Sequence, residues 1–230
     1  MIFGGWQKFS MMDFPGRASA ILFTQGCPFR CHFCHNPELV NPAQGMFAPV
    51  TEEEIMEFLA TRRGKLDGVV ISGGEPTLHS DLPEFIGRLK ALGFAVKLDT
   101  NGSRPDILEK IIRGGLVDYI AMDYKAPLEK YWLVAGSAGE AKNIKRSARL
   151  IMDSSVPYEF RTTVVKELLS EEDILLIAGE IAGAKKYILQ KFRPEKTLDP
   201  AFAEATTYSD EEFAKITKKI SSFDAQCLWR

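Results

Sequence analysis

Residues 68–76 read Gly-Val-Val-Ile-Ser-Gly-Gly-Glu-Pro, an apolar run that ends in two glycines, a glutamate and a proline. A short apolar run bounded by turn residues is typical of a strand that is buried on both faces. A helix is predicted to follow from about residue 80 to residue 92, where Gly93 supplies a C-terminal stop. The stretch therefore predicts one strand-turn-helix unit, with its strand over residues 68–72.

The same alternation continues on both sides of this unit. Further strands are predicted over residues 18–24, 94–99, 117–123, 158–165 and 186–189. Helices are predicted from capping boxes at Thr51 with Glu54 and at Ser209 with Glu212, after Ser170, and over 105–112 and 140–152. Six βα units in succession indicate an α/β fold with a parallel sheet and right-handed crossovers. Because a closed eight-stranded barrel typically needs about 250 residues, we expect a partial (β/α)6 TIM-like barrel that stays open.

The composition excludes several classes of protein. The chain has 230 residues, 45% hydrophobic content, and 29 basic against 31 acidic side chains, so its net charge is about −2. This balance argues against binding to nucleic acid or to a membrane surface, and no apolar run approaches the ~20 residues of a spanning helix. We expect a cytoplasmic protein with a single domain over residues 1–230. Its core would cover about 18–190, followed by a helical extension over about 200–230.

Polar residues gather where the predicted strands end. The first strand leads into a cysteine loop, Arg161 interrupts the strand over 158–165, and the other ends carry Ser72-Gly-Gly-Glu-Pro76, Asp99-Thr-Asn-Gly102, Met122-Asp-Tyr-Lys125 and Gln190-Lys191. A single glycine turn or strand-end aspartate is ordinarily a turn or a cap. In parallel βα folds, however, the carboxyl ends of the strands meet at one rim that carries the active site. Six such positions at one rim therefore indicate a functional site.

Three of the four cysteines lie within eight residues, in Cys27-Pro-Phe-Arg-Cys31-His-Phe-Cys34. Three thiolates on one loop can hold a [4Fe-4S] cluster and leave one iron free to bind a small molecule. A disulfide framework is disfavoured, because no apolar signal segment begins the chain. A zinc site with His32 or His35 as fourth ligand stays open, although structural zinc usually takes two separated pairs of ligands. Cys227 is expected to pack as a small apolar residue.

The cysteine loop and the glycine turn together resemble the radical S-adenosylmethionine superfamily over nearly the whole chain. The loop, with aromatic Phe33 before Cys34, is similar to the superfamily signature, and Gly73-Gly-Glu-Pro76 is similar to its second motif. The resemblance implies an oxidoreductase that binds a [4Fe-4S] cluster through Cys27, Cys31 and Cys34. It also implies that S-adenosylmethionine binds to the open iron of that cluster.

Further motifs resemble the activating enzymes of glycyl radical enzymes. These motifs are Asp13-Phe-Pro-Gly-Arg17, Cys34-His-Asn36, Asp99-Thr-Asn-Gly102 and Asp123-Tyr-Lys125. The chain looks most like the anaerobic ribonucleoside-triphosphate reductase activating proteins, with the pyruvate formate-lyase activating enzyme a close relative. The resemblance implies that an electron from a flavodoxin or ferredoxin drives cleavage of S-adenosylmethionine. Hydrogen would then be abstracted from a glycine of a partner glycyl radical enzyme, with anaerobic ribonucleotide reductase the first candidate.

The resemblance also implies roles for single residues. Cys27, Cys31, Cys34 and Lys125 would be catalytic. The cofactor would be bound by Phe33, Gly73, Gly74, Glu75, Asp99, Asn101, Lys125, Arg161 and Gln190. The two glycines would let backbone approach the cofactor's amino group, and Glu75 can equally be a helix-start charge. Asp99, Thr100 and Asp123 would hold a monovalent cation.

Two other functions stay open. One is a radical S-adenosylmethionine enzyme with a small-molecule substrate, similar to 7-carboxy-7-deazaguanine synthase; the Cys34-His-Asn36 motif argues against it. The other is a zinc-stabilised binding module without catalysis. An open partial barrel favours entry of a glycine-bearing protein loop, because a small substrate would need a closed pocket.

Overall fold

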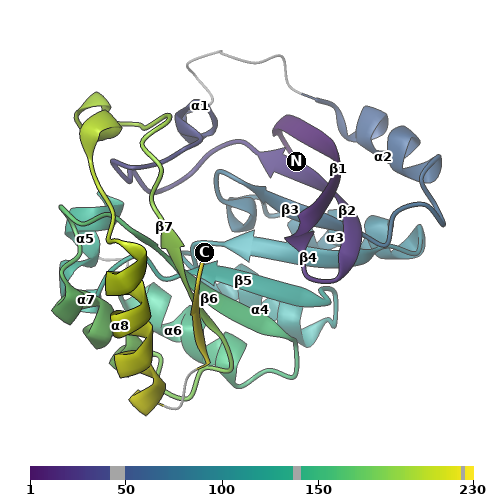
Figure 1. The fold of residues 1–230 in the computed structure, drawn as a ribbon. Helices are drawn as coiled ribbons and strands as arrows, with labels where there is room; N and C mark the ends of the chain where they lie inside the picture. Colours follow the sequence, from purple (N-terminus) through teal and green to yellow (C-terminus); the bar gives the residue numbers. More distant parts are fainter. Residues whose placement is uncertain (42–49, 137–140, 224–225) are drawn as a thin grey trace.

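A computed structural model describes residues 1–41, 50–136, 141–223 and 226–230. The strands form one sheet in the order β1-β2-β3-β4-β5-β6-β7-β8 (Figure 1). They are β1 (Phe3–Phe14), β2 (Arg17–Thr24), β3 (Gly68–Gly73), β4 (Ala95–Thr100), β5 (Tyr119–Asp123), β6 (Tyr158–Val164), β7 (Tyr187–Lys191) and β8 (Cys227–Trp229). β1 is antiparallel to β2, and each later pair of neighbours is parallel. In the described part of the chain no pairing joins β8 to β1, so the predicted open α/β barrel is confirmed.

Helices connect the parallel strands. They are α1 (Pro37–Val40), α2 (Glu52–Ala60), α3 (Leu82–Ala91), α4 (Pro105–Arg113), α5 (Tyr131–Ala135), α6 (Ala141–Met152), α7 (Glu171–Glu180) and α8 (Asp210–Ile220). The predicted starts at Thr51, Ser170 and Ser209 are confirmed as capping boxes, in which the hydroxyl accepts from a backbone N–H of the first turn. Figure 1 shows α2 and α3 toward the β1 end of the sheet, and α6, α7 and α8 toward the other end. Within the described ranges, every helix is too short or too polar to cross a membrane.

Two details differ from the sequence predictions, and a third lies outside the described residues. β1 and β8 are not predicted, and the segment expected to be a helical extension ends in β8, where Cys227 pairs with Tyr187. β1 has register irregularities that break its alternation, and β8 has only three residues, so neither shows a strand pattern. Both pair with open edges of the parallel strands, which the local sequence does not reveal. Finally, α6 begins at Ala141, and the predicted start at Glu140 lies outside the described residues.

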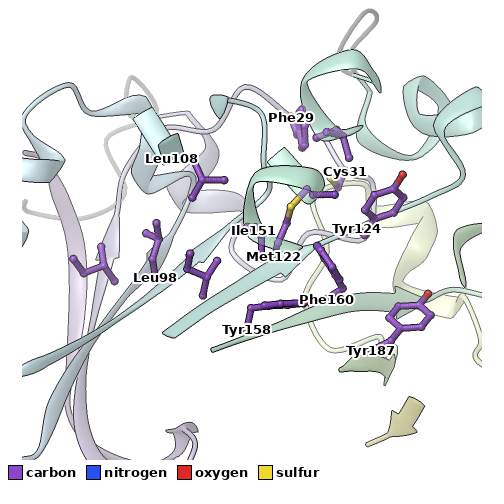
Figure 2. Packing of buried hydrophobic residues seen from close by; sticks show 14 of the residues in the cluster. Phe29, Cys31, Leu98, Leu108, Met122, Tyr124, Ile151, Tyr158, Phe160 and Tyr187 are labelled. Carbon is purple, nitrogen blue, oxygen red and sulfur yellow. The ribbon is translucent and has the colours of Figure 1, made fainter. Parts of the chain in front are cut away.

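The main hydrophobic core lies between the outer face of the sheet and the helices. Figure 2 shows Leu98, Met122 and Phe160 of successive strands near Leu108 of α4 and Ile151 of α6. Alternate strand residues point to the inner face of the sheet, because successive side chains in a strand point to opposite faces. Among the described residues, the apolar cluster on that face is small and consists of Phe14, Ile21, Val70 and Ala95. The rest of the inner face is left for polar side chains.

Candidate active site

One cavity opens at the carboxyl ends of the parallel strands, and we call it the cysteine cavity. It has about 830 Å³ of empty space, including the part open to solvent. It is lined by Cys27, Phe29, Cys31, Phe33, Cys34, His35, Asn36, Val40, Ser72, Gly73, Gly74, Glu75, Asp99, Thr100, Asn101, Asp123, Lys125, Arg161 and Thr163. The structure thus brings together every predicted site residue except Gln190.

The cysteine loop places three free thiols at this cavity. Cys34 N–H donates to the Cys31 carbonyl at 3.0 Å, and the Asn101 side-chain amide donates to Cys27 Sγ at 3.6 Å. Burial raises the pKa of Cys27 to about 12 and that of Cys31 to about 11. Such thiols are protonated at neutral pH, so a metal that binds them as thiolates must displace their protons. Three sulfurs and no oxygen ligand form a donor set suited to an iron-sulfur cluster.

Each histidine of the loop has a hydrogen-bond partner at one ring nitrogen. The His32 Nδ1 atom lies 3.1 Å from Asp199 Oδ2, and its ring stacks on Phe202 at 5.3 Å. The His35 Nε2 atom lies 2.9 Å from the Arg193 carbonyl oxygen. Across the described residues, no three His, Cys, Asp or Glu side chains converge as a single metal ion would require. The geometry therefore disfavours the zinc alternative.

The glycine turn after β3 is packed against the backbone that leads into the cysteine loop. Gly73 has φ +114°, and a Cβ there would lie 2.3 Å from the Thr24 nitrogen; a Cβ on Gly74 would lie 2.1 Å from the Gly26 carbonyl oxygen. Gly74 N–H donates to the Thr24 carbonyl at 2.8 Å. The need for glycine at both positions therefore comes first from contacts within the chain itself.

Glu75 joins two loops of the site. Its buried carboxylate accepts from the Thr77 N–H and hydroxyl at 3.1 and 2.5 Å. It also accepts from the Thr100 hydroxyl at 2.7 Å and from Asn101 N–H at 2.6 Å. Burial raises the pKa of Glu75, while these four donors favour the charged form. The interpretation as a helix-start charge fits, because Glu75 is the N-cap of the 3-10 turn Pro76–Leu78. Its carboxylate faces the protein, so it positions the β4 loop.

A chain of five charged groups crosses the inner face of the sheet. Asp99 accepts from Lys97 at 2.5 Å and from Arg161 at 3.3 Å. Asp123 accepts from Arg161 at 2.9 Å and from Lys125 at 3.2 Å. Burial alone would raise the pKa of Asp123, but Arg161 and Lys125 outweigh it and lower that pKa to about 2. Of the three cations, Arg161 and Lys125 line the cysteine cavity, where each can pair with an anionic ligand group.

The predicted cation site is arranged differently from the expectation. Arg161 lies between Asp99 and Asp123 and pairs with both of them. The hydroxyl of Thr100 donates to Glu75 and accepts from Gly102 N–H, so it is not turned toward the two aspartates. The three oxygen ligands are therefore not brought together here. Binding of a monovalent cation stays a prediction, with Arg161 as its competitor.

Gln190 lies in a second cavity, which we call the edge cavity because strand β1 and the end of strand β8 line it. The cavity is lined by Met12, Asp13, Pro15, Lys97, Glu159, Arg161, Gln190 and Arg230. Gln190 does not line the cysteine cavity, although its register partner Thr163 does, so binding of the cofactor by Gln190 stays a prediction. Only Arg161 lines both cavities.

Sequence reasoning missed two polar residues that support the site. Ser72 donates to Asp99 at 3.2 Å, and Lys97 is only 2% exposed where it pairs with the same carboxylate. Lys97 interrupts an apolar strand, which is the signal that singled out Arg161. The segment after β7 supplies Asp199 and Phe202, which contact His32 of the cysteine loop. The sequence pattern of that segment does not predict this contact.

Comparisons with known proteins agree with this geometry. The family model described as the radical SAM superfamily, where SAM denotes S-adenosylmethionine, matches residues 21–181. A protein of Methanocaldococcus jannaschii named "Putative glycyl-radical enzyme activating enzyme" is 36% identical over 218 residues, which cover 91% of this chain and 87% of that protein. The pyruvate formate-lyase-activating enzyme of Streptococcus mutans is 28% identical over 196 residues, which cover 81% and 73%.

A solved structure shows the same fold. It is a domain of the pyruvate-formate lyase-activating enzyme from Bacteroides vulgatus, with a TM-score of 0.53 and 20% identity. The match covers 71% of this chain and 98% of that domain. The likeness supports the open barrel architecture.

Proposed function

The chain belongs to the radical SAM superfamily and, within it, to the activating enzymes of glycyl radical enzymes, and on this premise we propose that it activates anaerobic ribonucleoside-triphosphate reductase. The observation that carries the proposal is the cysteine cavity, in which three free cysteines share a wall with the ion-paired cations Arg161 and Lys125. The cavity is open to solvent at the carboxyl ends of the strands, which gives a protein segment access to it.

The residues of the cavity fit the two groups that the family uses. Cys27, Cys31 and Cys34 would hold a [4Fe-4S] cluster, because their sulfurs are free and line one cavity. When bound at such a cluster, S-adenosylmethionine supplies reductive cleavage and a hydrogen-abstracting radical. The protein supplies binding, orientation and electrostatics.

The charged residues are oriented before any ligand binds. Arg161 and Lys125 are held by Asp123, and the pKa of Lys125 is raised because Asp123 outweighs the effect of its burial. Lys125 also lies 6.0 Å from the centroid of the Phe33 ring. Together they would hold the carboxylate of the cofactor as fixed cations, which costs little reorganisation. Asn101, donating to Cys27 Sγ, would stabilise the thiolate.

A partner protein is the substrate that the open sheet favours. β1 and β8 are both edge strands, and the edge cavity lies between them. An open barrel gives a glycine-bearing loop access to the cysteine cavity, whereas nothing among the described residues forms a lid over a small substrate. The curated relatives named as activating enzymes support the same class of partner. We infer further that a flavodoxin or ferredoxin supplies the electron.

Electron paramagnetic resonance tests the proposal. The anaerobically reconstituted, reduced protein is mixed with S-adenosylmethionine and the anaerobic ribonucleoside-triphosphate reductase of the same organism. We expect a glycyl doublet that disappears when the reductase's glycine is replaced by alanine. If the doublet forms only with another glycyl radical enzyme, the activase function stands and that enzyme is the partner. Rapid cofactor cleavage driven by a small metabolite, with no glycyl signal, would overturn the proposal in favour of the small-molecule alternative.

A further inference from the structure

Lys97 is a buried lysine on strand β4, two residues before Asp99, so the two side chains lie on the same face of the sheet. Its side chain is 2% exposed, and its ammonium donates to Asp99 Oδ1 at 2.5 Å. A lysine is almost never fully buried unless it is paired, because an ammonium loses its hydration when it leaves water. The burial of Lys97 therefore depends on its pairing with Asp99.

The two oxygens of Asp99 accept from different donors. Oδ1 accepts from Lys97, whereas Oδ2 accepts from the Ser72 hydroxyl at 3.2 Å and from Arg161 at 3.3 Å. Asp123 is occupied in the same way, with Arg161 at Oδ1 and Lys125 at Oδ2. Each of the four carboxylate oxygens of the predicted cation site thus accepts from a donor of the protein.

A monovalent metal ion would have to displace these donors. Hard cations are held by several oxygen ligands that converge on one point. Here the oxygens of the two aspartates are turned to protein cations, and the Thr100 hydroxyl donates to Glu75. At Asp99 the arrangement therefore fits a tethered ammonium better than a bound metal ion.

Lys97 reaches Asp99 from outside the cysteine cavity. Asp99 lines the cysteine cavity, whereas Lys97 lines the edge cavity. Lys97 can therefore neutralise Asp99 without occupying space that the cofactor would fill. Without Lys97, the vacated oxygen of Asp99 would attract Arg161 and would repel a carboxylate group in the cysteine cavity.

We propose that Lys97 is a built-in cation for Asp99, and that its ammonium takes the place of a bound monovalent cation at that carboxylate. Lys97 thereby keeps Arg161 available for the carboxylate of S-adenosylmethionine. The inference rests on the proposed function and adds a residue that prepares the cofactor site. Because Lys97 acts through Asp99 and Arg161, it is a positioning residue.

Cofactor affinity in matched lysine variants tests this inference. Isothermal titration measures binding of S-adenosylmethionine to the anaerobically reconstituted protein in choline chloride, which supplies no small metal cation. Lys97→Met should weaken binding about tenfold, because it removes the charge and keeps most of the side-chain volume. Lys90→Met serves as the control, since Lys90 pairs with Asp118 at 2.7 Å and lines neither cavity. It should bind the cofactor as wild type does.

Chemical rescue separates the charge of Lys97 from its packing. Lys97→Ala removes the atoms that n-propylammonium would replace, and the edge cavity, with about 650 Å³ of empty space including the part open to solvent, gives a small amine access to that position. We expect n-propylammonium to restore most of the affinity that Lys97→Ala loses, and n-propanol, which has the same length and no charge, to restore none. Lys97→Met should not respond to the amine, because its side chain fills the space.

The outcomes distinguish the inference from the function on which it rests. If Lys97→Met binds the cofactor like wild type, or if Lys90→Met loses as much affinity, the inference is wrong and the activase function stands. These two variants decide alone if Lys97→Ala does not fold. A loss in Lys97→Ala that the amine does not reverse, or that n-propanol reverses equally, would overturn the role of the charge.

The wild-type protein tests the function separately. If it binds S-adenosylmethionine but forms no glycyl radical with any glycyl radical enzyme of the organism, the activase function fails while the role of Lys97 is still decided by the variants. If wild type does not bind S-adenosylmethionine at all, both proposals fail together.

Discussion

The cysteine cavity and the edge cavity share Arg161 but differ in how their polar groups are satisfied. In the cysteine cavity Asp99, Asp123 and Glu75 all have their partners, and the loop conformations are fixed by contacts within the chain. In the edge cavity the amide of Gln190 has no partner among the described residues. The first site is preorganised for a ligand of fixed shape, whereas the amide of Gln190 in the second is half-exposed and open to solvent.

The largest expected effect separates the cysteines of the two regions. Cys31→Ala should abolish iron binding and cofactor cleavage, because two thiolates cannot hold the cluster. Cys227→Ala, on the strand that borders the edge cavity, should retain both. Iron and sulfide analysis after anaerobic reconstitution measures the difference. A Cys31→Ala protein with wild-type iron content would contradict the assignment.

Arg161→Met tests the residue that the two cavities share. It leaves Asp99 and Asp123 without the cation that lies between them, so we expect a loss of about 3–5 kcal/mol in the free energy of unfolding. Binding of S-adenosylmethionine should be lost as well. Arg113→Met, at an exposed arginine paired within α4, should change stability by less than about 1 kcal/mol. Equal denaturant midpoints for the two variants would refute the preorganised ion-pair chain.

Gly74→Ala probes the steric rigidity of the cysteine cavity. The new Cβ would lie 2.1 Å from the Gly26 carbonyl oxygen, so the entry to the cysteine loop must shift. We expect a destabilisation of about 1–3 kcal/mol and reduced cluster content. Gly5→Ala on β1, where nothing lies within 4 Å, serves as the control in thermal unfolding. If both variants unfold alike and hold equal iron, the close backbone contact is not required.

The smallest expected effect concerns the predicted monovalent cation. Affinity for S-adenosylmethionine should rise with potassium or sodium by about 1 kcal/mol or less, because Arg161 already neutralises Asp99 and Asp123. Asp99→Ala should lose this dependence. Isothermal titration in potassium and in a bulky organic cation makes the comparison. Identical affinities in the two buffers would mean that no monovalent cation binds here and that Arg161 and the lysines alone neutralise Asp99 and Asp123.

The parallel strands and capped helices could be predicted because their signals are local. The apolar run over residues 68–72 became β3, and the hydroxyls of Thr51, Ser170 and Ser209 cap helices as expected. The polar strand ends could be predicted to meet, because parallel strands place their carboxyl ends at one rim. These inferences need only periodicity, spacing and the handedness of βα units.

The sequence by itself determined the cysteine spacing, the glycine turn and the set of charged residues at the rim. Only the tertiary structure decided how these groups pair: Arg161 between two aspartates, Glu75 facing inward to Thr100, and Gln190 in the edge cavity. Strand β8 likewise depends on the open edge of β7. Spacing along the chain sets which side chains are near one rim, but partners in space depend on register, curvature and packing between distant segments.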